Sequence, residues 1–152
     1  PMAYVAISHS LVHFLEKQKG VPTTAILVGF EKHHLSVTVV RAGKLDGVKI
    51  VARGENCALD IEKALLSFTG IETLPSKILI YGVGAAGLKT QLLSFSWMSN
   101  LSFLHFPKIE VLEEDIEIKS VCLAGGSEIN NEVLYTDQPT RKLEEREDIL
   151  KD

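Results

Sequence analysis

The sequence predicts an α/β domain whose mixed sheet begins with an antiparallel three-strand meander and is flanked by helices. Residues 25–45 read AILVGFEKHHLSVTVVRAGKL, an apolar run and a β-branched run joined by a polar turn. Helical periodicity precedes this segment between residues 4 and 18, and a second buried run, KILIY, follows at residues 77–81. Because periodicity and length separate strands from helices, these segments set the order of the elements.

Composition is that of a globular domain. The 152 residues are 45% hydrophobic and 24% charged, with a net charge of −4. This acidic balance disfavours nucleic acids and anionic membranes, which attract basic surfaces. The sequence shows neither a signal peptide nor an apolar run of the ~20 residues that span a bilayer. Its two cysteines fit a reducing cytoplasm better than a disulfide scaffold, so we expect a cytoplasmic protein. Because the first residue is Pro1 and not methionine, we expect a domain of a longer protein.

The first half of the chain predicts a helix, three strands and a second helix. The helix of residues 4–18 has one apolar face. Residues 25–30 are continuously apolar, as in a strand covered on both faces. Residues 35–41 alternate and form its antiparallel partner, and a turn leads to a third strand at residues 48–53. Asp60 is then expected to cap the second helix.

The second half predicts a glycine turn after KILIY and a helix over residues 88–95. Residues 101–106 are expected to form a strand that Pro107 ends, with residues 109–112 extended. Beyond this point, residues 113–124 fit a helix, whereas residues 121–126 fit a buried strand equally well. We expect one domain over residues 1–136 and a charged helix or tail over residues 137–152.

Residue types that ligate metals or act as nucleophiles occur without a supporting arrangement. His9 and His13 share a helix face, but Ser10 stands where a zinc protease carries its glutamate. Cys57 and Cys122 have no paired spacing and no base placed beside them, so we expect both in the core. We therefore predict no catalytic residue and no metal site. Four acidic residues lie close together in the sequence: Glu113, Glu114, Asp115 and Glu117. A charged, solvated loop is a simpler interpretation of them than a cation site.

The glycine-rich segment after KILIY is the principal candidate binding site. Gly82, Gly84 and Gly87 match G-x-G-x-x-G between a strand and a helix. In that setting the glycines let the backbone approach a pyrophosphate at a helix N-terminus. Against a dinucleotide site, the motif lies in the second half of the chain, and the strand that ends near Phe106 has no acidic residue at its tip. A glycine turn that only joins strand to helix is the alternative.

The order of elements resembles the second half of an actin-like ATPase domain, a ribonuclease H-like fold, and in particular the bacterial cell-division and type IV pilus-assembly actin homologues. In that family a helix precedes the strand with the phosphate-binding turn, and two antiparallel strands and a helix follow. Residues 4–68 have this order, residues 78–88 resemble the adenosine-side motif, and residues 101–107 resemble the next strand. The resemblance covers about residues 4–130. It implies that a nucleotide would lie near Gly82, Gly84, Ala85 and Gly87.

The phosphate-binding turn departs from the family pattern. The family has Asp-x-Gly and small hydroxyl residues there, which manage Mg²⁺ and let phosphate approach the backbone. Residues 29–34 instead read GFEKHH, with the bulky Phe30 and no aspartate. The segment between Phe68 and Lys77 is too short for the subdomain that the family usually inserts. Because an actin-like ATP site also lies between two domains, we do not expect this chain alone to hydrolyse ATP.

Three functions fit this pattern. The first is a non-catalytic assembly or scaffold module that binds a protein partner or a second copy of itself. The second is a nucleotide-binding half-domain for ATP and Mg²⁺, completed by another domain or subunit. The third is a dinucleotide-binding enzyme, which requires a parallel βαβ unit around residues 77–106.

Overall fold

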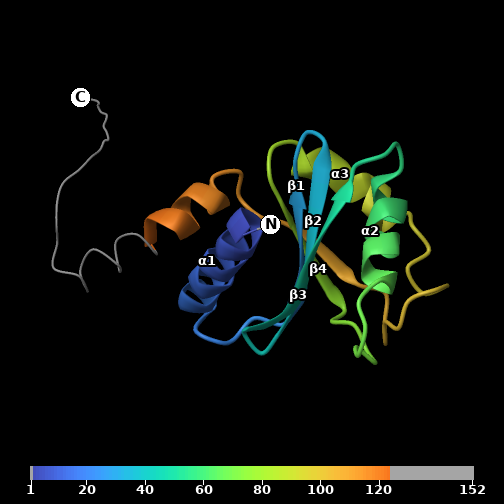
Figure 1. Cartoon of the computed structure of the whole chain (residues 1–152), viewed down its shortest axis with the longest axis horizontal. Coiled ribbons are helices and arrows are strands. Elements are labelled where there is room, and N and C mark those ends of the chain that lie inside the picture. Colours follow the sequence, from blue (N-terminus) through green and yellow to red (C-terminus); the bar gives the residue numbers. More distant parts are fainter. Residues whose placement is uncertain (1, 124–152) are drawn as a thin grey trace, which may run out of the picture. The chain divides into compact units, whose positions relative to one another are not determined.

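A mixed five-stranded sheet, in the order β3-β2-β1-β4-β5, forms the centre of the fold (Figure 1). The computed structural model describes residues 2–123. The chain divides into two units, Pro1–Val121 and Cys122–Asp152, and the sheet lies within the first. In chain order the elements are α1 (Met2–Lys19), β1 (Ala25–Phe30), β2 (His34–Arg41), β3 (Lys44–Ala52), α2 (Cys57–Leu66), β4 (Lys77–Tyr81), α3 (Ala85–Leu93) and β5 (Lys108–Val111).

The strands pair in both directions. β1 is antiparallel to β2, and β2 is antiparallel to β3, which confirms the predicted meander. β1 is parallel to β4, and β4 is parallel to β5. In the central strand, Val28 lies opposite Val37 of β2 and Ile80 of β4. The unit β4-α3-β5 is therefore a parallel βαβ crossover, and the α/β fold class is as predicted.

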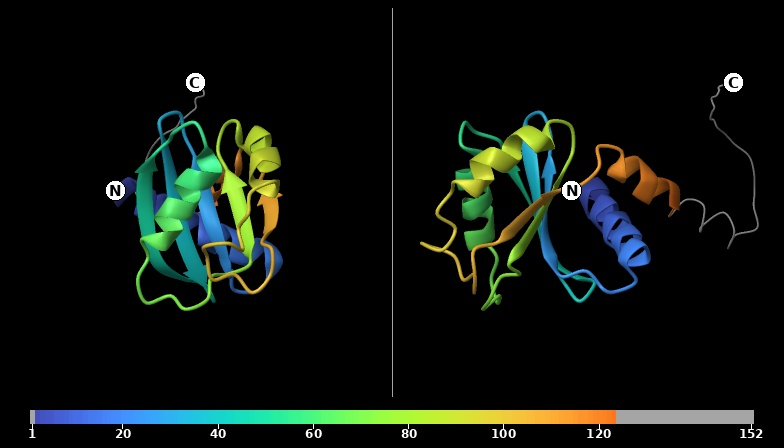
Figure 2. Two further views of the ribbon diagram at one scale, coloured as in Figure 1. Left: turned by 90° about the vertical axis from the view of Figure 1, so that its right-hand side faces the viewer. Right: turned by 180° about the vertical axis from the view of Figure 1, so that it is seen from behind.

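Helices cover both faces of the sheet, with α1 on one face and α2 and α3 on the other (Figure 2). All six residues of β1 are buried, which confirms that this strand is covered on both sides. The periodicity of α1 places its apolar residues on the sheet, as one face of an amphipathic helix requires. Side chains that fill the α1 side are Leu11, Val12, Leu15, Leu27 and Leu79, and those on the opposite side include Ile61, Leu65, Leu88, Leu92 and Trp97.

β3 begins four residues earlier than the strand predicted at residue 48. A two-residue turn at Ala42 and Gly43, with φ of 50° and 80°, joins β2 to β3. Positive φ at both positions suits a hairpin, because the turn then matches the twist of the strands. Pairing consequently starts directly at Arg41 and Lys44.

The predicted helix cap at Asp60 is wrong, because α2 starts at Cys57. The side chain of Asn56 caps the helix, and its Oδ1 accepts a hydrogen bond from the Leu59 N–H at 3.1 Å. Asp60 lies inside the first turn, where its Oδ2 accepts from the Gly54 N–H at 2.6 Å. A cap must precede the first turn to reach the unpaired N–H groups, and Asn56 has that position.

The predicted strand at residues 101–106 is also wrong. This segment makes one isolated bridge, between Leu74 and Phe103, and the strand of this region is β5. The buried apolar residues of segment 101–106 instead hold a loop against the core. The fully buried Trp97 donates a hydrogen bond from Nε1 to the Leu92 carbonyl at 2.7 Å, and its ring meets Phe95 and Phe103 edge to face.

Residues 116–123 are helical, so a helix is confirmed in this segment, but it begins three residues later than the predicted residue 113. The strand alternative is wrong for residues 121–123. Ile116 and Ser120 are buried, whereas Ile118 and Val121 are exposed. The prediction that Cys122 lies in the core is wrong. Cys122 is exposed, because it lies four residues after the exposed Ile118 and so shares its face of the helix. The predicted domain end at residue 136 and the tail of residues 137–152 lie outside the described residues. No helix of the described chain is long and apolar enough to cross a membrane.

Candidate functional site

The glycine turn lies at the carboxyl ends of β1 and β4. These strands are parallel, and Gly29 lies opposite Tyr81 in their register. The turn after β1 and the turn after β4 therefore meet at one edge of the sheet, where open α/β sheets bind ligands. Gly82 and Gly84 have φ of 110° and 86°, and Ala85 begins α3. The structure thus brings together the hairpin turn and the glycine turn that the sequence analysis singled out.

Close contact with Phe30 explains two of the three glycines in the motif. A Cβ at Gly82 would collide with the Phe30 carbonyl oxygen, and a Cβ at Gly84 would lie 3.2 Å from the Phe30 ring. Only glycine combines these positive φ angles with such approach. A Cβ at Gly87 would have no neighbour within 4 Å. Packing between the two turns therefore accounts for Gly82 and Gly84 without a ligand.

Arg53 completes this cluster from the end of β3. Its guanidinium lies 3.9 Å from the centroid of the Phe30 ring, a cation–π contact. Nη1 of the same side chain donates hydrogen bonds to the carbonyl oxygens of Glu31 at 2.9 Å and Lys32 at 3.4 Å. Its backbone N–H donates to the His33 carbonyl at 2.9 Å. The Phe30–Arg53 stack thus fixes the turn between β1 and β2.

A buried polar cluster that sequence reasoning missed lies on the α1 side of the same edge. Tyr81 and Ser36 are 3.4 Å apart at their hydroxyl oxygens, and Ser8 and Thr38 are 3.1 Å apart. Burial raises the pKa of Tyr81 to about 12, although the Ser36 hydrogen bond opposes this shift. A Cβ at Gly29 would strike the Tyr81 ring and Ser36, so glycine is required there. The sequence feature that could have indicated this cluster is the pair Ser36 and Thr38, two hydroxyl residues that lie two apart in β2 and so face the same side of the sheet.

Acidic groups flank this edge. Burial raises the pKa of Glu117, and the negative charge of Glu31 raises it further. The ammonium of Lys119 lies 2.8 Å from the Glu113 carboxylate and 3.6 Å from that of Asp115, so both acids form ion pairs with Lys119. Within residues 2–123, no group of three or more histidine, cysteine, aspartate or glutamate side chains could hold a metal ion.

Three cavities lie away from the glycine turn. One of ≈ 340 Å³ is next to the end of α1, between His13 and Pro22. A second of ≈ 230 Å³ lies between the end of α1 and the start of β4. The third, of ≈ 130 Å³, lies between α2 and the loop after α3. Gly82 and Gly84 line none of these three.

The sheet order, the helices on both faces and the meeting of the two turns define a mixed α/β fold. A solved structure of a protein from Bacteroides thetaiotaomicron, described as having an actin-like ATPase fold and unknown function, is similar with a TM-score of 0.52 and 8% identity. The match covers 77% of this chain and 44% of that chain, so this chain spans less than half of its neighbour. At such low identity the similarity shows the fold alone.

The predicted actin-like fold is thereby confirmed, and the narrower resemblance to the second half of cell-division and pilus-assembly homologues stays a prediction. No protein-family model matches the sequence, and a search of curated proteins gave no match.

Proposed function

We propose that this chain is a non-catalytic domain of actin-like fold that serves as a protein assembly or scaffold module. The observation that carries this proposal is the Phe30–Arg53 stack at the carboxyl ends of β1 and β4. The Phe30 ring, which carries the Arg53 guanidinium, lies 3.2 Å from the position of a Cβ at Gly84 and so takes space that a phosphate would need beside this glycine. The turn also lacks the aspartate that would manage Mg²⁺.

The free energy needed to move the Phe30 ring out of its packing is comparable with the binding free energy of a weakly bound nucleotide. Phe30 is 9% exposed and belongs to the core on the α2 and α3 side. Removing a buried phenylalanine side chain from its packing costs about 3–5 kcal/mol. A millimolar dissociation constant corresponds to about 4 kcal/mol. Expelling the ring would therefore cancel the affinity of a weakly bound nucleotide.

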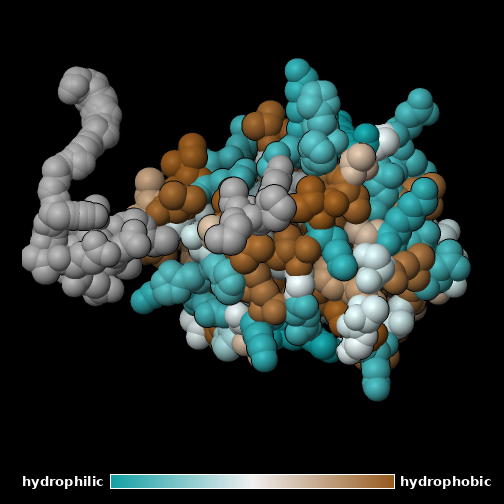
Figure 3. Space-filling view, viewed as in Figure 1, coloured by the Kyte–Doolittle hydropathy of each residue, from teal (hydrophilic) through white to brown (hydrophobic). Residues whose placement is uncertain are grey.

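The free edge of β3 supports a docking role. β3 has nine residues and pairs with β2 on one side, and the sheet order gives it no other neighbour among the described strands. Such an edge can accept an extended segment through backbone hydrogen bonds. Val48 and Ile50 are half-buried along this strand. Apolar patches are visible on the surface shown in Figure 3, where they interrupt hydrophilic side chains.

The partner in this proposal is another protein or a second copy of the chain. The resemblance to cell-division and type IV pilus-assembly actin homologues favours a cytoplasmic setting in one of those machines. Because the chain spans 44% of its structural neighbour, another domain or subunit can supply the missing part of an actin-like assembly.

A nucleotide-binding half-domain is the second candidate function, favoured by the backbone of the glycine turn. Gly84 is the N-cap of α3 and makes no side-chain capping hydrogen bond. Helix N-termini of this kind attract anions through unpaired N–H groups and the helix dipole. The dinucleotide-binding enzyme shares this feature, and the parallel β4-α3-β5 unit meets its topological requirement.

Calorimetric titration of the chain with ATP and Mg²⁺, and separately with NAD, tests these functions. We expect no binding heat at the glycine turn. Heat with ATP that disappears in Gly84→Val would overturn the non-catalytic proposal in favour of the half-domain, and the same result with NAD would favour the enzyme. Thr90→Val is the matched control, because it is a nearly isosteric change at an exposed position of α3 outside the glycine turn.

Light scattering after size exclusion tests assembly through β3. If two copies join at this edge, the mass should rise with concentration, and Ile50→Lys should suppress the rise. Leu104→Lys makes the same chemical change at a side chain that is 72% exposed and lies in the loop before β5. A mass that stays monomeric at every concentration would contradict self-assembly and leave docking to a different protein.

A further inference from the structure

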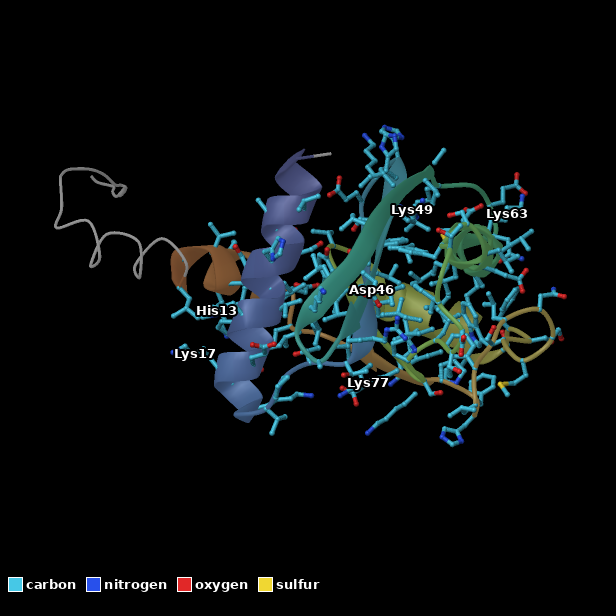
Figure 4. All side chains as sticks on the ribbon, turned by 60° about the horizontal axis from the view of Figure 1, so that its bottom comes forward. His13, Lys17, Asp46, Lys49, Lys63 and Lys77 are labelled. Atoms are coloured by element: carbon cyan, nitrogen blue, oxygen red, sulfur yellow. The ribbon has the colours of Figure 1, made fainter. Side chains whose placement is uncertain are left out.

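Two lysines from distant parts of the chain meet at the end of the sheet opposite the glycine turn. Lys19 is the last residue of α1, and Lys77 is the first residue of β4. Both line the cavity of ≈ 230 Å³ between these elements. In Figure 4, Lys77 lies near the lower end of the sheet, well separated from Lys63 on α2. The lysines are at the amino ends of β1 and β4, so this cavity is separate from the site beside Phe30.

The charged residues among those that line this cavity are both lysines, Lys19 and Lys77. Lys108 of β5 lies opposite Lys77 in the strand register. The nearby carboxylate is Glu110, whose Oε2 lies 3.2 Å from the Lys108 ammonium. Burial opposes ionisation of Glu110, but Lys108, Lys77 and Lys19 outweigh it and lower its pKa. Glu110 is thus paired with Lys108 and also interacts with the charges of Lys77 and Lys19.

The placement of Lys19 and Lys77 at one cavity disfavours the charged form of Lys77, and a bound anion would offset this effect. The pKa of Lys77 is lowered, first by its interaction with the Lys19 side chain, then by burial and by the charges of Lys19 and Lys108. Glu110 acts in the opposite direction and does not restore the usual pKa. The negative end of the α1 dipole favours Lys19 at that position. It does not account for a second lysine that β4 supplies.

The walls of the cavity are held in place by the core and by the β2–β3 turn. Leu15 and Leu79 line it and are each 1% exposed. Thr24 also lines it, and its hydroxyl accepts a hydrogen bond from the Ala42 N–H at 2.9 Å. The carbonyl of Thr23 accepts from the Gly43 N–H at 2.8 Å. The cavity is therefore formed before any ligand binds, which reduces the entropy cost of binding.

We propose that this cavity binds a small anion, a phosphate or carboxylate compound, whose charged group lies between the ammonium groups of Lys19 and Lys77. A volume of ≈ 230 Å³ is below the ~300–1,000 Å³ of pockets for drug-sized ligands, which sets the size of the ligand. The leucine walls suit a short apolar part. An anion also removes the repulsion between the lysines, so the pKa of Lys77 rises and binding takes up protons at alkaline pH.

Thermal unfolding and calorimetry of the full chain test this proposal, with inorganic phosphate and butyrate as separate probes and sodium chloride at equal ionic strength as the reference. We expect one probe or both to raise the melting temperature above the chloride reference. A response to phosphate alone identifies a phosphate compound, and a response to butyrate alone identifies a carboxylate. Lys19→Met and Lys77→Met should each weaken binding about tenfold, the effect of losing one charged contact. Lys63→Met, an exposed lysine on α2, should leave it unchanged.

Two results would overturn the proposal. One is the absence of any response to both probes beyond chloride in the folded wild-type protein. The other is an equal loss of binding in Lys63→Met and Lys77→Met, which would show general screening of charge. If Lys77→Met does not fold, NMR shifts of the lysine side chains in the wild-type protein replace it, and they should change at Lys19 and Lys77. ATP heat that survives in Gly84→Val but is lost in Lys77→Met belongs to this cavity and not to the glycine turn.

Discussion

Gly82 determines how closely the ends of β1 and β4 can approach. Its φ of 110° and the Phe30 carbonyl oxygen next to it both exclude a side chain. The glycine that most resembles a nucleotide-binding signature is thus required by the protein's own packing. Phe30 also holds the ends of these strands together, because its ring packs against Gly84 and carries the Arg53 guanidinium. At the scale of single residues, the glycines and Phe30 serve the packing between the carboxyl ends of β1 and β4.

Tyr81 should contribute stability that is lost in strong alkali. Burial raises its pKa from 10.0 to about 12 in the folded protein. The folded state then holds the phenolic proton more tightly than the unfolded state, so the contribution is complete below pH 10 and is lost as the pH rises through the folded pKa. The shift corresponds to about 3 kcal/mol. Urea unfolding between pH 9 and 12 should show this decline in the wild-type protein and a smaller decline in Tyr81→Phe.

The two other tyrosines remain in both proteins, so the difference between the two curves isolates Tyr81. Parallel curves over this range would contradict the assignment. An ultraviolet titration of phenolate would then show that Tyr81 ionises at the ordinary pH of tyrosine.

At the scale of elements, α2 depends on its cap at Asn56. Asn56→Ala removes the acceptor of the Leu59 N–H and should lower the free energy of unfolding by about 1 kcal/mol, within a range of about 0.5–2. Glu55→Ala alters the exposed preceding residue and should change stability by less than about 0.5 kcal/mol. Urea denaturation followed by circular dichroism measures both. Equal losses in the two variants would show that the side chain of Asn56 is not the cap.

Strands whose whole length is buried were predictable from the sequence. β1 and β4 have the bounds that their runs AILVGF and KILIY indicate, because a strand covered on both faces is mostly apolar. The segment of residues 101–106 looked similar, but its aromatic residues anchor a loop through Trp97. A short apolar run does not specify whether its backbone pairs, and that depends on tertiary neighbours.

The candidate site could be predicted only in part. The glycine turn and the bulk of Phe30 are visible in the sequence, since both are local features. The contact between Arg53 and Phe30 is not visible in the sequence. It depends on the strand register of the meander, which brings residue 53 next to residue 30. The pair Lys19 and Lys77 belongs to no motif and depends on how α1 ends beside β4. Predicting such contacts requires the tertiary arrangement.

At the scale of the whole molecule, the sheet should show a gradient of protection from its centre to the β3 edge. β1 lies between β2 and β4 and is buried along its full length, so its amides can exchange only when the sheet opens. β3 is held from one side, and most of its residues are half-buried. Local opening requires less free energy at an edge than global unfolding, which is about 5–15 kcal/mol for a domain. In dilute protein, the amides of β1 should therefore exchange far more slowly than those of β3.

The same hydrogen-exchange measurement, repeated at rising protein concentration, connects this gradient to the proposed assembly role. If a second copy pairs with β3, the protection of β3 should increase with concentration while that of β1 stays constant, because β1 is already enclosed. Ile50→Lys should abolish the increase, and Leu104→Lys should preserve it. Protection of β3 equal to that of β1 in dilute protein would contradict the sheet order, since it would place β3 inside the sheet. Protection of β3 that never changes with concentration would remove a second copy as the partner at this edge.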